Sequence, residues 1–217
     1  MRANYQLTSR SRMLRLDLFW RVMNPPQGAT VLNLGGATPH LGSILLRKEH
    51  EDPTYVEQPE QDPRWRSLRV IALNLDAAAM KEYRQLYPHN SALIGDGCRM
   101  PFSDKSVDIV FSNAVIEHLA PPQQVLMARE IMRVGRSWFV TTPNFYYPFE
   151  IHHKLPCIQF LPRFLQLFIR RRFRTYPGNE PLTLLKASQL QRLFPGSAIV
   201  KQRVTFYPET LIAYHTK

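Results

Sequence analysis

The stretch from Leu93 to Leu119 constrains the fold of this chain more than any other part of the sequence. Two short apolar runs, Ala92–Ile94 and Val107–Phe111, have the length and composition of buried strands. The first run is followed by Gly95-Asp96-Gly97 and the second by Ser112-Asn113. Small and polar residues at the ends of successive strands are typical of the carboxyl edge of an open α/β sheet, which is where such folds bind ligands.

Apolar strands and amphipathic helices alternate through most of the chain. The predicted strands are residues 30–34, 70–75, 92–94, 107–111 and 137–142. The predicted helices are residues 13–22, 77–87 and 121–134, and residues 199–207 and 210–214 predict a closing hairpin. This alternation favours an α/β fold with a mostly parallel sheet, helices on both faces and the strand ends on one edge. The polar segment 49–66 holds three prolines and is predicted to be an exposed loop.

The length of 217 residues fits a single domain spanning residues 1–217. Beyond Thr142 the pattern changes to an aromatic segment punctuated by prolines, so residues 145–187 are predicted to form a helical cap over the substrate. Within the cap, an apolar stripe with helical spacing runs from Leu161 to Ile169 and ends in Arg170-Arg171-Arg172. The stripe either lies on an anionic membrane surface or packs on the sheet as a lid.

Positive charge is concentrated in the last third of the chain. The chain has a net charge of +11, and residues 151–217 hold 11 Lys and Arg against 2 Asp and Glu. Such a region faces an anionic partner, such as a phosphorylated substrate or lipid headgroups, or is a solvated basic surface. The basic cluster is short and no nucleic-acid module is recognisable, so nucleic acid is not expected as a partner.

The sequence also predicts a compartment. Cys98 and Cys157 are interpreted as two free thiols in a reducing compartment. Arg and Ser recur through residues 2–15, unlike the apolar core of a signal peptide, and no apolar run is long enough to span a membrane. We therefore expect a cytoplasmic protein, with peripheral contact at the inner face of the membrane if the apolar stripe binds lipid.

The ends of the first three strands offer candidate ligand contacts. The first strand runs into Gly35-Gly36, and a glycine turn lets the backbone approach a ligand closely. Asn74, at the end of the second strand, can reach ribose hydroxyls, whereas Asp76 suits the N-cap of the helix that follows. Asp96, after the third strand, is either an acceptor for an adenine amino group or a turn residue between two glycines.

These motifs together resemble the class I S-adenosylmethionine-dependent methyltransferases, of the methyltransferase type 11 kind. The resemblance covers roughly residues 30–144, and its strongest part is the run G-D-G-x-x-x-P-F-S-D-K-S-V-D-I-V-F-S-N-A-V-I-E-H-L that starts at Gly95. The segment Thr141–Asn144, followed by two histidines and Pro156, is similar to a bacterial subgroup of this family. The resemblance implies a Rossmann-like, doubly wound sheet of seven strands with an antiparallel C-terminal strand.

The resemblance also implies a set of cofactor contacts. The glycine turn would hold the methionine end of S-adenosylmethionine, Asn74 the ribose and Asp96 the adenine, with Ser112 and Asn113 on the methionine side. The full set of implied cofactor-binding residues is Asn33, Gly35, Gly36, Thr38, Asn74, Leu75, Asp96, Gly97, Ser112 and Asn113.

The chain departs from the family pattern at its acidic positions. Asn33 and Asn74 stand where the family has carboxylates, and Ala37 and Pro39 replace two glycines of the first motif. A neutral amide makes weaker hydrogen bonds to hydroxyl groups than a carboxylate does. An alternative hypothesis is therefore a non-catalytic binding or scaffold protein on a degenerate methyltransferase fold. A nicotinamide-dependent oxidoreductase is disfavoured because no G-x-G-x-x-G follows the first strand.

Methyl transfer from a sulfonium is an in-line displacement that mainly requires alignment and exclusion of water. A base is needed only if the acceptor must lose a proton, and the candidate catalytic residues are His118, His152 and His153. His118 could instead only pack at the turn after its strand. No Cys/His set has metal-ligand spacing, so no metal is predicted. The acceptor is expected to be a small molecule, a glycan or a lipid-linked substrate.

Overall fold

The structure is a computed structural model that describes residues 2–37, 58–150, 155–162, 164–166, 168–169 and 183–217. Its centre is a seven-stranded sheet with the order β3-β2-β1-β4-β5-β9-β8. The strands in this order are Ser91–Ile94, Arg69–Asn74, Thr30–Leu34, Val107–Asn113, Gly135–Pro143, Thr210–His215 and Ala198–Gln202. The first five are parallel, and β9 is antiparallel to both β5 and β8. The predicted fold class is thus confirmed.

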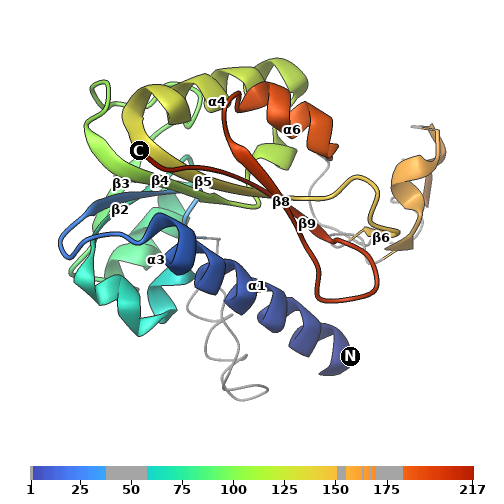
Figure 1. The fold of residues 1–217 in the computed structure, drawn as a ribbon, viewed down its shortest axis with the longest axis horizontal. Coiled ribbons are helices and arrows are strands. Elements are labelled where there is room, and N and C mark those ends of the chain that lie inside the picture. The colour runs from blue at the N-terminus through green and yellow to red at the C-terminus, as the bar shows by residue number, and fades with distance from the viewer. Residues whose placement is uncertain (1, 38–57, 151–154, 163, 167, 170–182) are drawn as a thin grey trace.

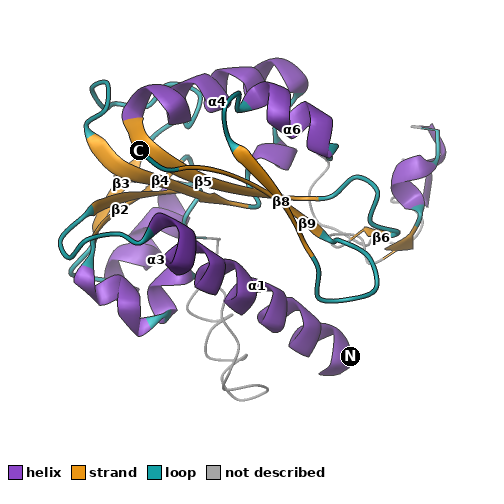
Figure 2. Cartoon of the chain, in the orientation of Figure 1, coloured by secondary structure: helices purple, strands orange, loops and turns teal. Residues whose placement is uncertain are grey.

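Helices cover both faces of the sheet (Figures 1 and 2). On one face lie α1 (Arg2–Met23) and α3 (Ala77–Leu86), and on the other lie α4 (Pro121–Val134) and α6 (Ala187–Leu193). The central strands β1 and β4 are largely buried on both faces, as expected for a sheet sandwiched between helices. The chain therefore forms three layers, with the sheet in the middle.

The face beneath α1 is organised by aromatic side chains. Phe19 is fully buried and its ring contacts Trp65, Phe111 and Phe139 with centroid separations of 5.3 to 5.5 Å. Such edge-to-face and offset pairs add to the hydrophobic stabilisation of the buried area. The helix α1 begins well before the predicted residues 13–22. Its N-terminal half continues past this aromatic cluster toward the C-terminal strands (Figure 1).

The prediction of an exposed loop over residues 49–66 is wrong for the part that the structure describes. Two 3-10 helices, η1 (Pro59–Gln61) and η2 (Pro63–Ser67), pack this segment against the sheet. Trp65 is 2% exposed and stacks on Phe19. The polar composition of the segment predicted that it would be exposed. The segment is packed instead because Trp65 contacts Phe19 of α1 and Phe111 of β4.

The predicted cap region is described only in part. It contains a short hairpin of β6 (Phe149–Glu150) and β7 (Leu155–Pro156), followed by η4 (Ile158–Phe160). Residues 164–166 and 168–169 are helical, and two side chains of the apolar stripe, Phe164 and Phe168, are 74% and 66% exposed. Arg170–Arg172 lie outside the described residues, and the boundaries of the cap remain a prediction. Among the helices that the structure describes, none has the length and apolar character needed to cross a membrane.

Candidate functional site

The carboxyl ends of four parallel strands meet at one edge of the sheet. Pairing in register aligns Leu34 of β1 with Leu73 of β2 and with Ser112 of β4. Asn74 of β2 lies beside Ile94 of β3 in the same way. The residues that follow these strands are therefore neighbours, and the sequence prediction that they share one edge is confirmed. Ligands of open α/β sheets bind at such an edge.

The turn after β1 requires its glycine. Gly35 has φ +75°, and a Cβ added there would overlap the side chain of Val115. A Cβ on Gly36 would stand 2.5 Å from Nδ2 of Asn33, so this side chain packs directly under the turn. Ala37 keeps the left-handed conformation with φ +87°, although it carries a Cβ that disfavours it. The backbone of the turn thus retains the tight shape that a glycine-rich motif produces.

A buried carboxyl group lies beneath this turn. Oε1 of Glu60 accepts hydrogen bonds from Nδ2 of Asn33 at 2.7 Å and from the hydroxyl of Tyr83 at 2.6 Å. Asn90 donates in turn to the Tyr83 hydroxyl at 3.1 Å. Burial raises the pKa of Glu60 above its ordinary range, against the lowering effect of these two hydrogen bonds. Position 33 therefore has an amide, but an acidic group from η1 stands in hydrogen-bond contact with it.

The side chain of Asn74 is committed to the protein itself. Its Nδ2 donates to the carbonyl oxygen of Ala37 at 2.8 Å, and its Oδ1 accepts from the backbone N–H of Asp76 at 3.1 Å. Asp76 caps α3 through hydrogen bonds from Ala78 and Ala79, as its position in the sequence indicates. Asn74 therefore ties the ends of β1 and β2 together, and its contact with a ribose remains a prediction.

At the end of β3 the chain turns through Asp96, which is exposed. Its Oδ1 accepts from the backbone N–H of Cys98 at 2.8 Å, so Asp96 does shape a turn. Burial and the neighbouring Asp96 raise the pKa of the Cys98 thiol to about 11. Gly97 lies close to β1, since a Cβ on it would be 3.1 Å from Cδ1 of Leu34, whereas Leu75 is 66% exposed at the adjacent tip.

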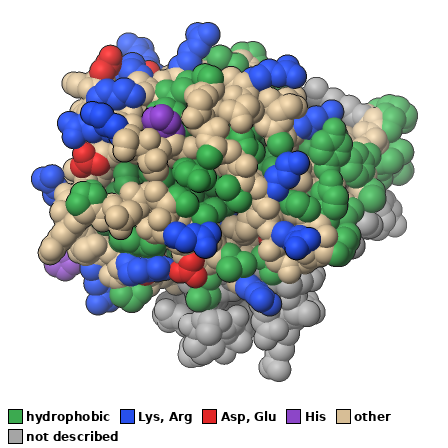
Figure 3. Space-filling model, in the orientation of Figure 1, with side chains coloured by type: hydrophobic (Ala, Val, Ile, Leu, Met, Phe, Trp, Pro, Cys, Tyr) green, Lys and Arg blue, Asp and Glu red, His purple; other side chains and the backbone are tan. Residues whose placement is uncertain are grey.

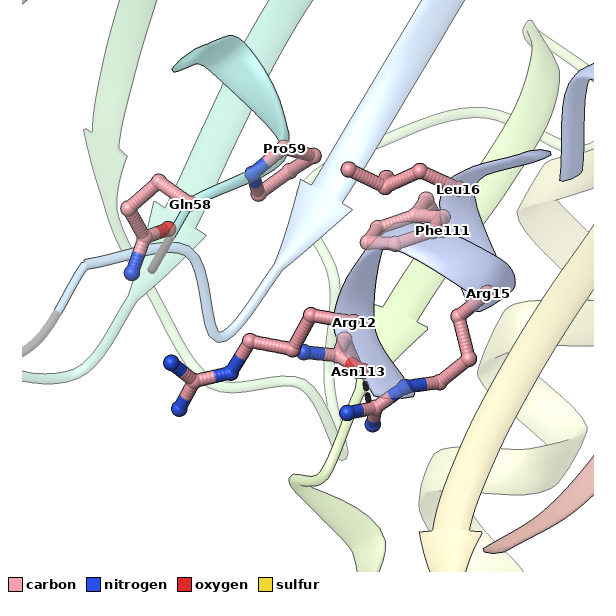
Figure 4. Close-up of a pocket in the computed structure, with 7 residues that line it drawn as sticks. All are labelled: Arg12, Arg15, Leu16, Gln58, Pro59, Phe111 and Asn113. Atoms are coloured by element: carbon pink, nitrogen blue, oxygen red, sulfur yellow. Dashed lines mark hydrogen bonds between the residues drawn. The ribbon is translucent and has the colours of Figure 1, made fainter. Parts of the chain in front are cut away.

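Two arginines of α1 reach the end of β4 (Figure 4). Arg15 donates from Nη1 to Oδ1 of Asn113 at 2.9 Å, and the hydroxyl of Thr141 donates to the same oxygen at 2.8 Å. Arg12 extends beside this pair, and both arginines line a small hollow of about 10 Å³, room for one water molecule. The hydroxyl of Ser112 is fully buried and has no hydrogen-bond partner within the described ranges.

The candidate bases are only partly described. His118 is half-buried in η3 (Ile116–His118), directly after the β4 tip. Its neighbour Glu117 is fully buried, accepts from the hydroxyl of Thr142 at 3.1 Å, and accepts through its carbonyl from the N–H of Thr183. Thr38, His152 and His153 lie outside the described residues.

The sequence did not point to Arg12, Arg15, Gln58 or Glu60, all of which come close to the strand tips. Gln58 accepts from the backbone N–H of Ala37 at 3.3 Å. These residues come from segments distant in the chain, and an i, i+3 spacing of two arginines on a helix was the only signal that could have drawn attention to them.

Comparison with known proteins finds similarity in the central part of the chain. Residues 60–137 match the family model described as a methyltransferase domain. This central part of the chain is therefore similar to a methyltransferase domain. A protein of Mycolicibacterium smegmatis named "Probable S-adenosylmethionine-dependent methyltransferase" is 38% identical over 77 residues, which are 35% of this chain and 30% of that protein. An uncharacterised protein of Mycobacterium tuberculosis is 31% identical over 135 residues, which are 60% of this chain and 41% of that protein. The chain thus spans less than half the length of these relatives.

Solved structures agree with the fold. A crystal structure of a protein from Pyrococcus horikoshii has a TM-score of 0.59 with 15% identity, covering 94% of this chain and 89% of that one. A structure titled as SAM-dependent methyltransferases from Methanosarcina mazei has a TM-score of 0.55 with 11% identity, covering 89% and 95%. At these identities the likeness concerns the fold alone.

The residues at the edge fit the cofactor that the family implies. S-adenosylmethionine carries a carboxylate, ribose hydroxyls and an adenine amino group. The α1 guanidinium groups match the carboxylate, because arginine is suited to carboxylate recognition. The exposed carboxylate of Asp96 matches an amino group, and the buried hydroxyl of Ser112 still offers hydrogen-bonding capacity.

Proposed function

We propose that this methyltransferase domain transfers a methyl group from S-adenosylmethionine to an acceptor bound at the same edge of the sheet. The observation that carries the proposal is the alignment of the Gly35 turn, Asp96 and the Asn113 tip in neighbouring strands, beneath arginines from α1. The cofactor supplies an electrophilic methyl group on a sulfonium. Arg15 and Asn113 would hold the methionine carboxylate, and Asp96 the adenine amino group.

The protein's own contribution to the displacement is alignment and the exclusion of water. Asn74 and Gln58 hold the turn at Ala37 in one conformation, which keeps the cofactor-binding backbone ready before a ligand arrives. His118 lies next to the β4 tip and is the described candidate for a base, while His152 and His153 remain candidates from the sequence alone. An acceptor that ionises on its own would need none of them.

Calorimetry with S-adenosylhomocysteine tests the proposal. The full chain is expected to bind this product, and Arg15→Gln is expected to weaken binding by about 10-fold or more, because a hydrogen bond to a charged group contributes about 1.5–3 kcal/mol. Arg21→Gln, which removes a charge from an exposed position of the same helix, is the matched control and should bind as the parent does. Absence of binding at millimolar ligand would contradict the proposal.

The alternative of a non-catalytic scaffold is not favoured. The family match and the relatives' names support an enzyme, and the amides at positions 33 and 74 are both built into hydrogen-bond networks that preserve the turn. Detection of a methylated acceptor after incubation with labelled S-adenosylmethionine separates the two hypotheses, since a scaffold binds the cofactor without turnover.

We also propose peripheral contact with an anionic membrane surface, which would place the enzyme at the cytoplasmic face of that membrane. Phe164, Phe168 and Phe206 are 66% to 75% exposed. Hydrophobic side chains gather at the end of the molecule where β6 lies, bordered by Lys and Arg side chains (Figure 3). Insertion of apolar residues together with attraction of basic residues is how such surfaces bind. Flotation with anionic vesicles at low salt should recover the protein, and Phe164→Ser with Phe206→Ser should abolish recovery; failure of the parent to float would contradict this contact.

A further inference from the structure

A second hollow lies beyond β5 at the same edge of the sheet. Its volume of about 370 Å³ falls in the range of small-molecule pockets. The walls come from the segment after β5, the beginning of α6, the strand β8 and the turn before β9. Neither the family match nor the relatives assign a role to this hollow, and none of the candidate cofactor residues lines it.

The hollow is close enough to the strand tips to serve the same reaction. Thr141 of β5 pairs with Asn113 at the β4 tip, and Asn144, three residues further along, lines the hollow. Three residues of extended chain cover about 10 Å. A small acceptor held in the hollow can therefore extend toward the Asn113 tip without any rearrangement of the sheet.

The walls of the hollow are fixed by hydrogen bonds. Asn144 is buried, donates from Nδ2 to the carbonyl oxygen of Pro208 at 2.9 Å and accepts from the N–H of Tyr146 at 3.1 Å. Its backbone N–H donates to the carbonyl oxygen of Glu209 at 2.9 Å. The side chain of Asn144 thus joins the backbone at Tyr146 to the backbone that follows Tyr207, and these two tyrosines line the hollow. The hollow is formed before any ligand binds.

The lining is positively charged, and the described residues that form it include no carboxylate. Lys186 and Lys201 both line the hollow. Across residues 183–217 the single acidic side chain is Glu209, which is buried and accepts from Ser11 and Val204 instead. The ammonium group of Lys186 lies 5.2 Å and 5.5 Å from the ring centroids of Phe145 and Tyr146, contacts that hold it in place without neutralising its charge.

We propose that this hollow binds a phosphate or diphosphate group of the methyl acceptor, with Lys186 and Lys201 as its cationic contacts. That the bound molecule is a methyl acceptor rests on the proposed function. That it carries a phosphate or diphosphate group rests on the charge and shape of the hollow. Two lysines that have no carboxylate beside them among the described lining residues raise the local concentration of anions in a concave site, and lysine binds phosphate as a point charge. The aromatic walls suit the uncharged remainder of such a molecule.

Calorimetry of the full chain with inorganic pyrophosphate at low ionic strength tests the inference. Lys186→Gln combined with Lys201→Gln is expected to weaken pyrophosphate binding by about 10-fold or more, since each contact is a charge-assisted one. Lys81→Gln combined with Arg129→Gln removes two exposed charges from α3 and α4 and is the matched control for net charge. Lys186→Arg keeps the charge and should retain binding.

Parallel titrations with S-adenosylhomocysteine separate this inference from the proposed function. Measurable and equal pyrophosphate binding by the lysine double variant and the control overturns the anion site, whatever the cofactor product does, and so does binding of neither pyrophosphate nor vesicles that contain phosphatidic acid. Loss of pyrophosphate binding in the lysine double variant, with S-adenosylhomocysteine bound equally by all variants, supports both. If no variant binds S-adenosylhomocysteine while the lysine dependence of pyrophosphate binding persists, the proposed function fails and the anion site stands.

A third arm distinguishes the source of the phosphate. Vesicles of phosphatidylcholine with phosphatidic acid present the same group at a lipid surface. Cosedimentation that depends on Lys186 and Lys201, without binding of free pyrophosphate, supports a lipid-linked phosphate. Binding of pyrophosphate that is unaffected by such vesicles supports a soluble phosphorylated acceptor.

Discussion

The surroundings of Glu60 raise the pKa of its carboxyl group. Its carboxyl group is buried, accepts from Asn33 and Tyr83 through one oxygen, and its other oxygen has no hydrogen-bond partner in the part of the chain that the structure describes. A charged carboxylate would lose its hydration here, so burial raises the pKa of Glu60. Burial of the Tyr83 hydroxyl and the neighbouring Glu60 likewise raise the pKa of Tyr83.

This arrangement predicts a pH dependence of stability. Because the folded-state pKa of Glu60 lies above the unfolded value near 4.5, the folded protein binds more protons than the unfolded chain in the interval between them. The contribution of Glu60 is therefore fully present below about pH 4.5 and is lost as pH rises toward the folded pKa. Glu60→Gln imitates the neutral carboxyl and should flatten this part of the curve, which urea denaturation at several pH values measures.

A second substitution tests whether Glu60 compensates for the amide at position 33. Asn33→Asp alone replaces the amide that donates to Glu60 by a second acid. The two buried acids then lose this hydrogen bond, which should lower the free energy of unfolding by about 1–3 kcal/mol. Asn33→Asp combined with Glu60→Gln restores one acid and one amide with their roles exchanged, so most of that loss should return. Additive losses in the double variant would show that the two positions are not coupled.

At the scale of elements, the passage from α4 into β5 has no connecting loop. Val134 ends the helix and Gly135 begins the strand. A Cβ on Gly135 would stand 2.8 Å from the carbonyl oxygen of Ser137 and 2.8 Å from Cγ2 of Val110. The adjacent Lys105 donates to the carbonyl oxygens of Met132 and Gly135, which stabilises the helix end.

Gly135→Ala is therefore expected to destabilise the protein by about 2 kcal/mol or more, because overpacking against backbone atoms cannot be relieved by a rotamer change. Gly28→Ala is the control: its φ of +77° is strained for alanine but nothing lies within 4 Å of the added Cβ. The control should cost about 1 kcal/mol from backbone strain alone. Thermal unfolding of both variants separates crowding from strain, and equal losses would argue against the crowding.

Periodicity predicts those elements whose burial follows from their own sequence. Strand β1 and helix α4 have the predicted bounds, 30–34 and 121–134. Their own apolar pattern indicates which residues are buried, so no distant partner is needed to predict them. Strand tips were predictable as a shared site because parallel strands end together. The packing of residues 58–66 was not, since Trp65 is buried by Phe19 and Phe111 from distant parts of the chain. For the same reason Arg15 and Glu60 could not be assigned to the site from the sequence.

At the scale of the whole molecule, the first helix and the last two strands are joined by buried polar groups. The hydroxyl of Ser11 donates to Oε1 of Glu209 at 3.1 Å and accepts from Nε2 of Gln202 at 2.9 Å. Gln202 also donates to the carbonyl oxygen of Ser11 at 3.0 Å. The partners are 198 and 191 positions away along the chain, so this contact closes the three-layer structure between its ends.

Ser11→Ala should lower the free energy of unfolding by about 1–2 kcal/mol, because it leaves the buried Oε1 of Glu209 without its donor. The loss should appear as a lower urea midpoint with the same slope, since a contact that joins both ends of the chain belongs to the cooperative unit and not to a fraying terminus. Ser106→Ala removes an exposed hydroxyl that donates to the carbonyl oxygen of Ser103 and should change stability by less than about 0.5 kcal/mol. A separate early transition in Ser11→Ala would instead show that α1 unfolds independently of the sheet.

A single cooperative loss of stability in Ser11→Ala would also link the Arg15 site on α1 to the C-terminal hairpin that lines the Lys186 hollow. The proposed cofactor and acceptor sites would then depend on one folded unit.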